Sequence, residues 1–178
     1  MISMVETCWG PRAVNDMSHW HLVNASSHFN HNVRVGKGAL LSVSAGIEAE
    51  PHLENAQTPY SYSRLLDPKE KVFEEVRSAK YPACPPRLKC LYVFDDYNLV
   101  ERALCEWFPN ERKIVRECRL LIGAITHKAD TRWLNAFPMQ WAKSADCYWA
   151  GEMNDNPLPE VLVHGALYFP KWESFSDD

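Results

Sequence analysis

Two histidines stand one residue apart in the stretch SHWHLVN, residues 18–24, with Trp20 between them. In a strand, His19 and His21 point to one side while Trp20 and Leu22 point to the other. Imidazoles on one strand face can bind a metal ion, act as bases or hold a substrate, and they can also be ordinary residues at the start of a sheet. The rest of the chain has to rank these alternatives.

A zinc site is one alternative, because Cys8 and further histidines also lie in the N-terminal third of the chain. A structural zinc site usually takes paired ligands at close spacing from two segments. The sequence has no second pair of that kind beside the two histidines. We therefore expect a protein that works without a metal ion.

A thiol nucleophile is another alternative. Cys84 precedes two prolines and can be paired in principle with one of the histidines, but none of the local signatures of cysteine enzymes surrounds it. The six cysteines form no CxxC motif, and we expect small buried thiols rather than disulfides. The phosphate-binding loops GxGxxG and GxxxxGK followed by Ser or Thr do not occur.

The composition is that of one folded domain, since 178 residues with 46% hydrophobic and 12% aromatic side chains are ample for a packed core. The net charge of −4 argues against broad, non-specific binding to nucleic acid, which needs a surplus of Lys and Arg. The sequence has no run of about 18 apolar residues, so we expect no membrane span. The N-terminus lacks a basic region followed by an apolar stretch, so we expect no secretion signal and a cytoplasmic protein.

Periodicity and turn residues divide the chain into helices and strands. Residues 1–17 are expected to form an irregular arm and residues 44–68 a long polar connection. Helices are expected at residues 68–81, 96–108 and 132–142. Strands are expected at residues 19–25, 39–43, 89–95, 113–125 and 159–169, with a loop at 126–133 and a short strand or turn at 146–152. This order has no regular βαβ alternation and predicts one mixed α+β domain over residues 18–178.

Several short pieces follow one another in order along residues 18–170. They are WH, FEEVR followed by YPACPPR, HKADTRW, CYWAGE and EVLVHG. The ordered set resembles the mono-ADP-ribosyltransferases of the His-Tyr-Glu type, the branch shared by poly-ADP-ribose polymerases and rifampin-modifying transferases. It resembles most closely a group of small uncharacterised bacterial proteins related to that superfamily. The resemblance implies a split, mostly antiparallel sheet with flanking helices around an NAD cleft.

The same resemblance implies an enzyme that takes NAD as co-substrate, needs no metal and releases nicotinamide. Carried over, His21 binds the ribose and Tyr92 stacks on the nicotinamide ring. Glu160 is the first choice for the catalytic acid because it opens a late strand, and Asp130 is the second because the rifampin-modifying branch has an aspartate in a comparable loop. A carboxylate near the ribose can offset the positive charge of an oxocarbenium-like transition state.

The diphosphate of NAD has to meet cations, and Arg64 and Arg87 are the candidates because both lie in loops beside expected strands. His19 shares a strand face with His21 and is expected to line the same cleft or its rim. The chain departs from the family pattern at Leu22, where many transferases have Gly-Thr after the histidine.

The acceptor of the ADP-ribose stays open between a protein, a nucleic acid and a small molecule, and the acidic net charge favours a protein. Small transferases of this kind are commonly toxins, phage-borne modifiers of host proteins or drug-inactivating enzymes. Two rivals stay open as well. One is an inactive nucleotide- or protein-binding module on the same fold, and the other is a zinc-dependent protein that uses the N-terminal histidines.

Overall fold

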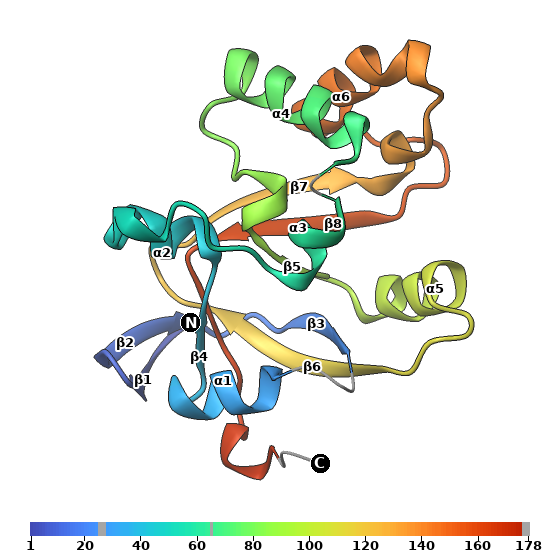
Figure 1. Ribbon diagram of the computed structural model, residues 1–178. Coiled ribbons are helices and arrows are strands. Elements are labelled where there is room, and N and C mark those ends of the chain that lie inside the picture. The colour runs from blue at the N-terminus through green and yellow to red at the C-terminus, as the bar shows by residue number, and fades with distance from the viewer. Residues whose placement is uncertain (25–27, 65, 176–178) are drawn as a thin grey trace. The chain divides into compact units, whose positions relative to one another are not determined.

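The fold combines antiparallel sheets with flanking helices, which confirms the expected α+β class (Figure 1). The computed structural model describes residues 1–24, 28–64 and 66–175. By the contacts between its residues, the chain forms two compact units, each assembled from separate segments. Unit 1 comprises residues 1–41, 92–124 and 165–178, and unit 2 comprises residues 42–91 and 125–164.

Strands and helices follow one another along the chain without regular alternation. The strands are β1 (Ile2–Thr7), β2 (Gly10–Asn15), β3 (His19–Asn24), β4 (Ala39–Leu41), β5 (Leu91–Val93), β6 (Lys113–Leu120), β7 (Ile125–Asp130), β8 (Pro159–His164) and β9 (Ala166–Tyr168). The α-helices are α1 (Phe29–Val35), α2 (Val43–Ala49), α3 (Pro59–Arg64), α4 (Pro68–Lys80), α5 (Tyr97–Trp107) and α6 (Trp141–Ala150). Short 3-10 helices cover Pro51–Leu53, Arg87–Lys89, Thr131–Asn135, Pro138–Gln140 and Trp172–Ser174.

Unit 1 is built on a four-stranded antiparallel sheet with the strand order β3-β6-β9-β4. The strand with the two histidines, β3, pairs along its whole length with β6, so that His19 lies opposite Cys118 and His21 opposite Arg116. The segment expected as one strand over residues 159–169 bends at a glycine and forms two strands, β8 and β9.

The core of unit 1 includes the contact of α5 with β3. The spacing predicted an apolar stripe on this helix, and Val100 and Ala103 of that stripe are fully buried against Phe94. Trp20 and Leu22 of β3 pack around them. Since side chains alternate along a strand, α5 covers the β3 face opposite to the one that carries the histidines.

The N-terminal residues differ from the expected irregular arm. The strands β1 and β2 form an antiparallel hairpin, with Ile2 opposite Asn15 and Thr7 opposite Gly10. The φ of Gly10 is +82°, a conformation that glycine adopts without strain at a tight turn. Exposed and less exposed side chains alternate along β1. The mixture of polar and apolar residues in its sequence does not distinguish such a half-exposed strand clearly from a loop.

Unit 2 places α4 and α6 side by side over the antiparallel pair of β7 and β8 (Figure 1). As expected from a proline in the first turn, α4 begins at Pro68, and the Asp67 side chain caps it by accepting a hydrogen bond from the Lys69 N–H. Trp149 of α6 is buried, and its indole N–H donates to the Phe73 carbonyl of α4 at 2.8 Å. This bond ties the two helices together.

Most of the segment 126–133, which we expected to form a loop, belongs to the strand β7. The residues of β7 pair with those of β8, from Ile125 opposite His164 to Asp130 opposite Pro159. The two strands therefore share one register, and this register decides on which face of the pair each side chain lies.

The helix α6 replaces the short strand or turn expected over residues 146–152. Its buried residues are Ser144, Ala145, Tyr148 and Trp149. Their spacing is that of one helix face, so packing overrides the strand propensity of the Cys-Tyr-Trp run. The segment 132–142, expected as a helix, instead forms two 3-10 turns before α6 begins, and Pro138 starts the second of them.

The long connection expected over residues 44–68 contains α2, a 3-10 helix and α3. The Ser42 side chain begins α2 by accepting a hydrogen bond from the Ala45 N–H at 3.2 Å. Across the described ranges 1–24, 28–64 and 66–175, the helices are all too short or too polar to cross a membrane.

Candidate functional site

Unit 2 holds a group of charged and hydroxyl-bearing side chains, which we call the Arg87 cluster. Its members are the half-buried Tyr60 and the buried Glu70, Arg87, Tyr148 and Glu160. The Arg87 Nη1 donates to the Glu70 Oε1 at 2.6 Å, and the Arg87 Nε lies 3.5 Å from the Glu160 Oε1. The Tyr148 hydroxyl donates to the same Glu160 oxygen at 2.8 Å. The Arg87 guanidinium carbon lies 5.4 Å from the centre of the Tyr60 ring, close enough for a cation–π contact.

Four members of the Arg87 cluster lie in elements that the local sequence favours. Two prolines precede Arg87 and lead into a 3-10 helix, Arg87–Lys89. Glu70 lies in the first turn of α4, where the helix dipole favours an acid. Tyr148 belongs to the buried face of α6, and Glu160 is the second residue of β8.

The charges in the Arg87 cluster do not balance pairwise, since two carboxylates share one guanidinium. Burial raises the pKa of Glu160, while Arg87 and the Tyr148 hydroxyl act to lower it. Burial also raises the pKa of the Tyr60 hydroxyl. A buried carboxyl group with a raised pKa takes up a proton more readily than an exposed one, which suits it to proton transfer.

Arg64, the second expected phosphate ligand, lies in a different environment from Arg87. Of its side chain, 48% is exposed. Its Nη1 lies 3.5 Å from the Asp67 Oδ2, and its guanidinium carbon lies 5.9 Å from the centre of the Tyr60 ring. Both expected arginines therefore lie near Tyr60, one buried and one open to solvent.

Asp130 is a cap rather than a group with free oxygens. Its Oδ1 accepts hydrogen bonds from the backbone N–H groups of Arg132 and Leu158 at 3.1 and 2.9 Å. Its Oδ2 accepts from the backbone and side-chain amides of Asn154, both at 2.9 Å. Burial alone would raise the pKa of Asp130, but these bonds hold it below its ordinary value.

The two expected acids lie on opposite faces of the β7–β8 pair. Asp130 stands opposite Pro159, whereas Glu160 stands opposite Ala129. Residues directly opposite each other share a face, and neighbours along a strand alternate. Asp130 and Glu160 are therefore not interchangeable at one site, and Glu160 is the one that belongs to the Arg87 cluster.

Unit 1 holds the pair His21 and Tyr92 that the sequence singled out. The His21 Nδ1 lies 2.6 Å from the backbone carbonyl oxygen of Tyr92. A carbonyl only accepts, so Nδ1 carries the hydrogen and Nε2 of the neutral ring keeps a lone pair. Burial lowers the pKa of His21, against the effect of the bond to the carbonyl, and so favours this neutral form.

His19 lies at the start of β3 and is 5% exposed. Its Nδ1 lies 3.3 Å from the Met17 carbonyl oxygen, and burial lowers its pKa. The expected role of His19 in lining an NAD cleft stays a prediction.

Cys84 does lie beside a histidine, His127. The Cys84 Sγ is 3.6 Å from the His127 Nδ1, and the His127 Nε2 is 3.0 Å from the Tyr148 carbonyl oxygen. Burial raises the pKa of Cys84 and lowers that of His127, so the pair favours a neutral thiol beside a neutral ring. In the part of the chain that the structure describes, no three His, Cys, Asp or Glu side chains are grouped to hold a metal ion.

Sequence reasoning did not single out Glu70, Tyr60 or Tyr148. Glu70 precedes Phe73 by three positions, which places an acid on the apolar face of α4. A buried acid on such a face needs a cation as partner, and this signal was available in the sequence. Tyr60 had no comparable signal, because it lies in a short helix within a polar segment.

The fold and the site define an α+β protein with a buried carboxylate–guanidinium cluster in one unit and a carbonyl-bound histidine in the other. The chain belongs to the DUF2441 family, described as protein of unknown function, whose family model matches residues 15–171. A search among curated proteins found no match.

Proposed function

We propose that this protein is an NAD-dependent mono-ADP-ribosyltransferase with an ADP-ribosyltransferase-like fold. The observation that carries the proposal is the Arg87 cluster, in which Glu160 is buried beside Arg87 and a tyrosine hydroxyl. Burying two carboxylates around one guanidinium costs desolvation energy, and groups in such environments concentrate at functional sites.

The proposed reaction breaks the bond between the nicotinamide nitrogen and the ribose anomeric carbon, and the electron pair leaves with nicotinamide. A nucleophile of the acceptor then forms a bond to the anomeric carbon and loses its proton. In this scheme the Glu160 carboxylate offsets the positive charge that develops on the ribose and receives the proton of the acceptor. Its raised pKa supports the second of these roles.

His21 and Tyr92 lie in unit 1 and Glu160 lies in unit 2, and the binding of NAD by His21 and Tyr92 stays a prediction of the family resemblance. The lone pair left on the His21 Nε2 supports acceptance of a hydrogen bond from a ribose hydroxyl, because the Nδ1 hydrogen is already engaged by the Tyr92 carbonyl. The Tyr92 ring is assigned to stacking on nicotinamide. Arg64 is assigned to the diphosphate, since its guanidinium is half-exposed while Arg87 is engaged by Glu70 and Glu160.

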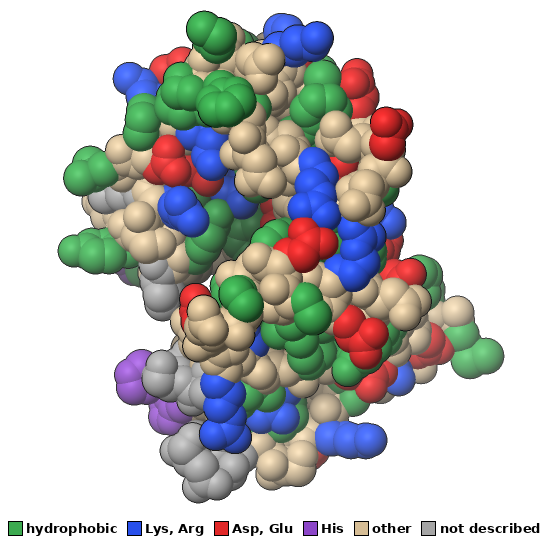
Figure 2. Space-filling model, turned by 90° about the vertical axis from the view of Figure 1, so that its right-hand side faces the viewer, with side chains coloured by type: hydrophobic (Ala, Val, Ile, Leu, Met, Phe, Trp, Pro, Cys, Tyr) green, Lys and Arg blue, Asp and Glu red, His purple; other side chains and the backbone are tan. Residues whose placement is uncertain are grey.

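A protein is the acceptor class that we propose. Figure 2 shows basic and acidic side chains interspersed with apolar ones on one face of the molecule. This distribution and the net charge of −4 favour a protein over nucleic acid, which attracts a continuous basic surface.

A second candidate function is nucleotide binding without catalysis on the same fold. The burial of Glu160 favours it, because only 7% of its side chain is exposed. The two candidates differ in one measurable respect, since only the transferase releases nicotinamide.

The test measures nicotinamide release from NAD, with and without a mixture of acceptor proteins. We expect release by the natural protein and a loss of about 100-fold or more in Glu160→Gln, with NAD affinity changed little, because the carboxylate acts on the transition state. Glu70→Gln is the matched control, since it removes the other carboxylate of the same cluster and should change release only several-fold.

Full activity in Glu160→Gln would contradict the proposal, as would equal losses in both variants, which would mean that the cluster acts only through its structure. NAD binding by calorimetry without any nicotinamide release would favour the second candidate.

A further inference from the structure

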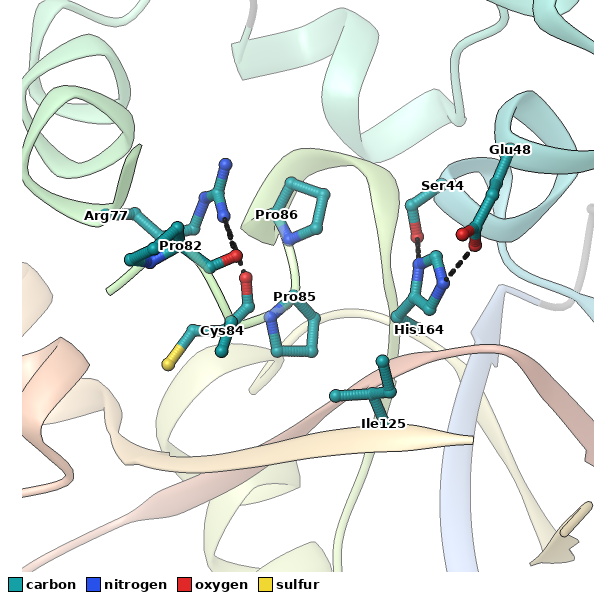
Figure 3. Close-up of a pocket in the computed structure, with 10 residues that line it drawn as sticks. Ser44, Glu48, Arg77, Pro82, Cys84, Pro85, Pro86, Ile125 and His164 are labelled. Carbon is teal, nitrogen blue, oxygen red and sulfur yellow. Dashed lines mark hydrogen bonds and ion pairs between the residues drawn. The ribbon is translucent and has the colours of Figure 1, made fainter. Parts of the chain in front are cut away.

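Unit 2 also has a pocket of about 250 Å³, and the residues that line it do not belong to the Arg87 cluster (Figure 3). Ser44, Glu48 and His164 lie along one side of it. The His164 Nδ1 is 2.9 Å from the Ser44 Oγ, and the His164 Nε2 is 2.9 Å from the Glu48 Oε2. In Figure 3 the imidazole stands between the serine and the glutamate, joined to each by a dashed line.

The local structure explains why these three side chains meet. Ser44 and Glu48 are four residues apart on α2, so they project from the same side of the helix. His164 is the last residue of β8. The helix and the strand end thus bring a hydroxyl, an imidazole and a carboxylate into one row.

The hydrogen bonds fix where the protons of the neutral histidine lie. A carboxylate has no hydrogen to donate, so the Nε2 of His164 carries one and donates it to Glu48. In the neutral ring, Nδ1 then has a lone pair and accepts the hydrogen of the Ser44 hydroxyl. This is the arrangement in which an imidazole acts as a general base on a serine.

The surroundings of Ser44 agree with this direction. The Ser42 Oγ accepts the Ala45 N–H at 3.2 Å and lies 3.1 Å from the Ser44 Oγ. Cys90 also hydrogen-bonds Ser44. Where Ser42 or the Cys90 thiol donates its hydrogen to the Ser44 oxygen, the hydrogen of the Ser44 hydroxyl is left for His164. Ser44 is only 9% exposed, but it borders the pocket, so the pocket is the route by which a substrate reaches it.

We propose that Ser44, His164 and Glu48 form a second reactive centre that hydrolyses esters. The Ser44 Oγ forms a bond to the ester carbonyl carbon while its proton passes to the His164 Nδ1. The carbon–oxygen bond to the alcohol then breaks, and the alcohol leaves with the electron pair and that proton. Water, losing a proton to the same Nδ1, attacks the acyl group, and Ser44 leaves as a hydroxyl. Glu48 stabilises the imidazolium formed in each half.

The pocket selects short, uncharged acyl groups. Its volume suits a short acyl group, and the rest of its lining is mainly apolar: Pro82, Ala83, Pro85, Pro86 and Ile125. The Arg77 guanidinium, which also lines the pocket, is engaged by Glu74 and by the Cys84 carbonyl. The Glu48 carboxylate, 75% exposed, disfavours anionic substrates.

The experiment treats the full chain with a fluorophosphonate probe, which transfers a phosphonyl group to an activated serine with loss of fluoride, and with p-nitrophenyl acetate. Mass spectrometry should find the label on Ser44 of the natural protein. Ser44→Ala should lose both label and hydrolysis, and His164→Gln should slow both by about 100-fold or more. Glu48→Gln should slow them less, by about tenfold, because its contact is exposed to solvent.

Ser78→Ala is the matched control, because it removes an exposed hydroxyl from another helix of unit 2 and should leave both rates unchanged. Circular dichroism shows whether each variant is folded. The labelling of Ser44 and the ester hydrolysis by the natural protein test the proposal even if a variant fails to fold. Absence of label on Ser44 in the folded natural protein, absence of ester turnover, or rates that survive His164→Gln would each overturn the proposal.

Discussion

Arg87 is a buried cation within unit 2. Its guanidinium is the cation next to two buried carboxylates, Glu70 and Glu160. A buried ion pair contributes little net stability over apolar residues, but removing one partner leaves the other charge buried and uncompensated. The loss of stability on substituting Arg87 therefore depends on the two buried carboxylates that remain without a cation.

We expect Arg87→Leu to lower the free energy of unfolding by about 3–5 kcal/mol, because it leaves both carboxylates without their cation. Urea unfolding followed by fluorescence measures this difference. Arg64→Leu is the matched control, since its guanidinium is half-exposed, lies 3.5 Å from the Asp67 carboxylate and makes only a distant contact with the Tyr60 ring, at 5.9 Å. Its cost should stay below about 1 kcal/mol. Equal costs for the two substitutions would show that Arg87 does not hold the cluster together.

At the scale of elements, Gly38 shows how a single turn positions neighbouring segments of unit 1. It precedes β4 and has a φ of +87°, and its carbonyl accepts the Phe169 N–H at 2.8 Å. A Cβ at this position would lie 2.4 Å from the Trp172 ring and 2.6 Å from the Tyr168 ring. The backbone and the two aromatic rings therefore both require glycine.

We expect Gly38→Ala to destabilise the protein by about 2–4 kcal/mol, as backbone strain and overpacking add. Gly10→Ala separates the two effects, because Gly10 has a similar φ of +82° but no atom within 4 Å of an added Cβ. Its cost should be about 1–2 kcal/mol, from the backbone alone. Thermal unfolding of both variants measures the difference, and equal shifts of Tm would mean that the two rings yield to the methyl group.

The sequence predicted best the elements that carry their own start signal and a regular stripe. Both α4, with Pro68 and its cap, and α5, with Val100 and Ala103 on one face, lie where expected. It failed at α6, where Tyr148 and Trp149 have a strand propensity that packing overrides. The local propensity of a segment predicts its secondary structure only when the tertiary packing of that segment favours the same structure.

The candidate site was predictable in part for the same reason. Glu160 and Arg87 were chosen one by one, and their proximity depends on a strand and a 3-10 helix that are far apart in the chain. The row of Ser44, Glu48 and His164 was not predicted, because the serine and the histidine are 120 residues apart. The spacing of residues in the sequence predicts which side chains share one face of a helix. It does not predict which strand end packs beside that face.

At the scale of the whole molecule, several buried histidines make stability depend on pH. Burial lowers the pKa of His19, His21 and His127, although a backbone bond acts against it in each case. A lowered pKa in the folded state means that the unfolded chain binds more protons around the ordinary value of about 6.5. The folded state is therefore most stable above that pH. It loses stability as the pH falls through the pKa values that these histidines have in the folded protein.

We expect the free energy of unfolding to fall between about pH 7 and pH 5, by up to about 1.4 kcal/mol per pH unit for each histidine that stays neutral. His21→Gln should make the free energy of unfolding less dependent on pH, because one of the titrating histidines is removed. Denaturant unfolding at a series of pH values measures this dependence. A variant whose slope matches that of the natural protein would show that His21 takes up its proton as readily when folded as when unfolded.

The division of the chain into units has a consequence for how the protein is made. The polypeptide passes from one unit to the other after residues 41, 91, 124 and 164. The last of these segments supplies β9, which lies between β6 and β4 in the sheet of unit 1. On a ribosome, that sheet stays incomplete until the residues after 164 have emerged. Until then β4 and one edge of β6 lack their partner strand, and a chaperone that shields these edges should raise the yield of native protein.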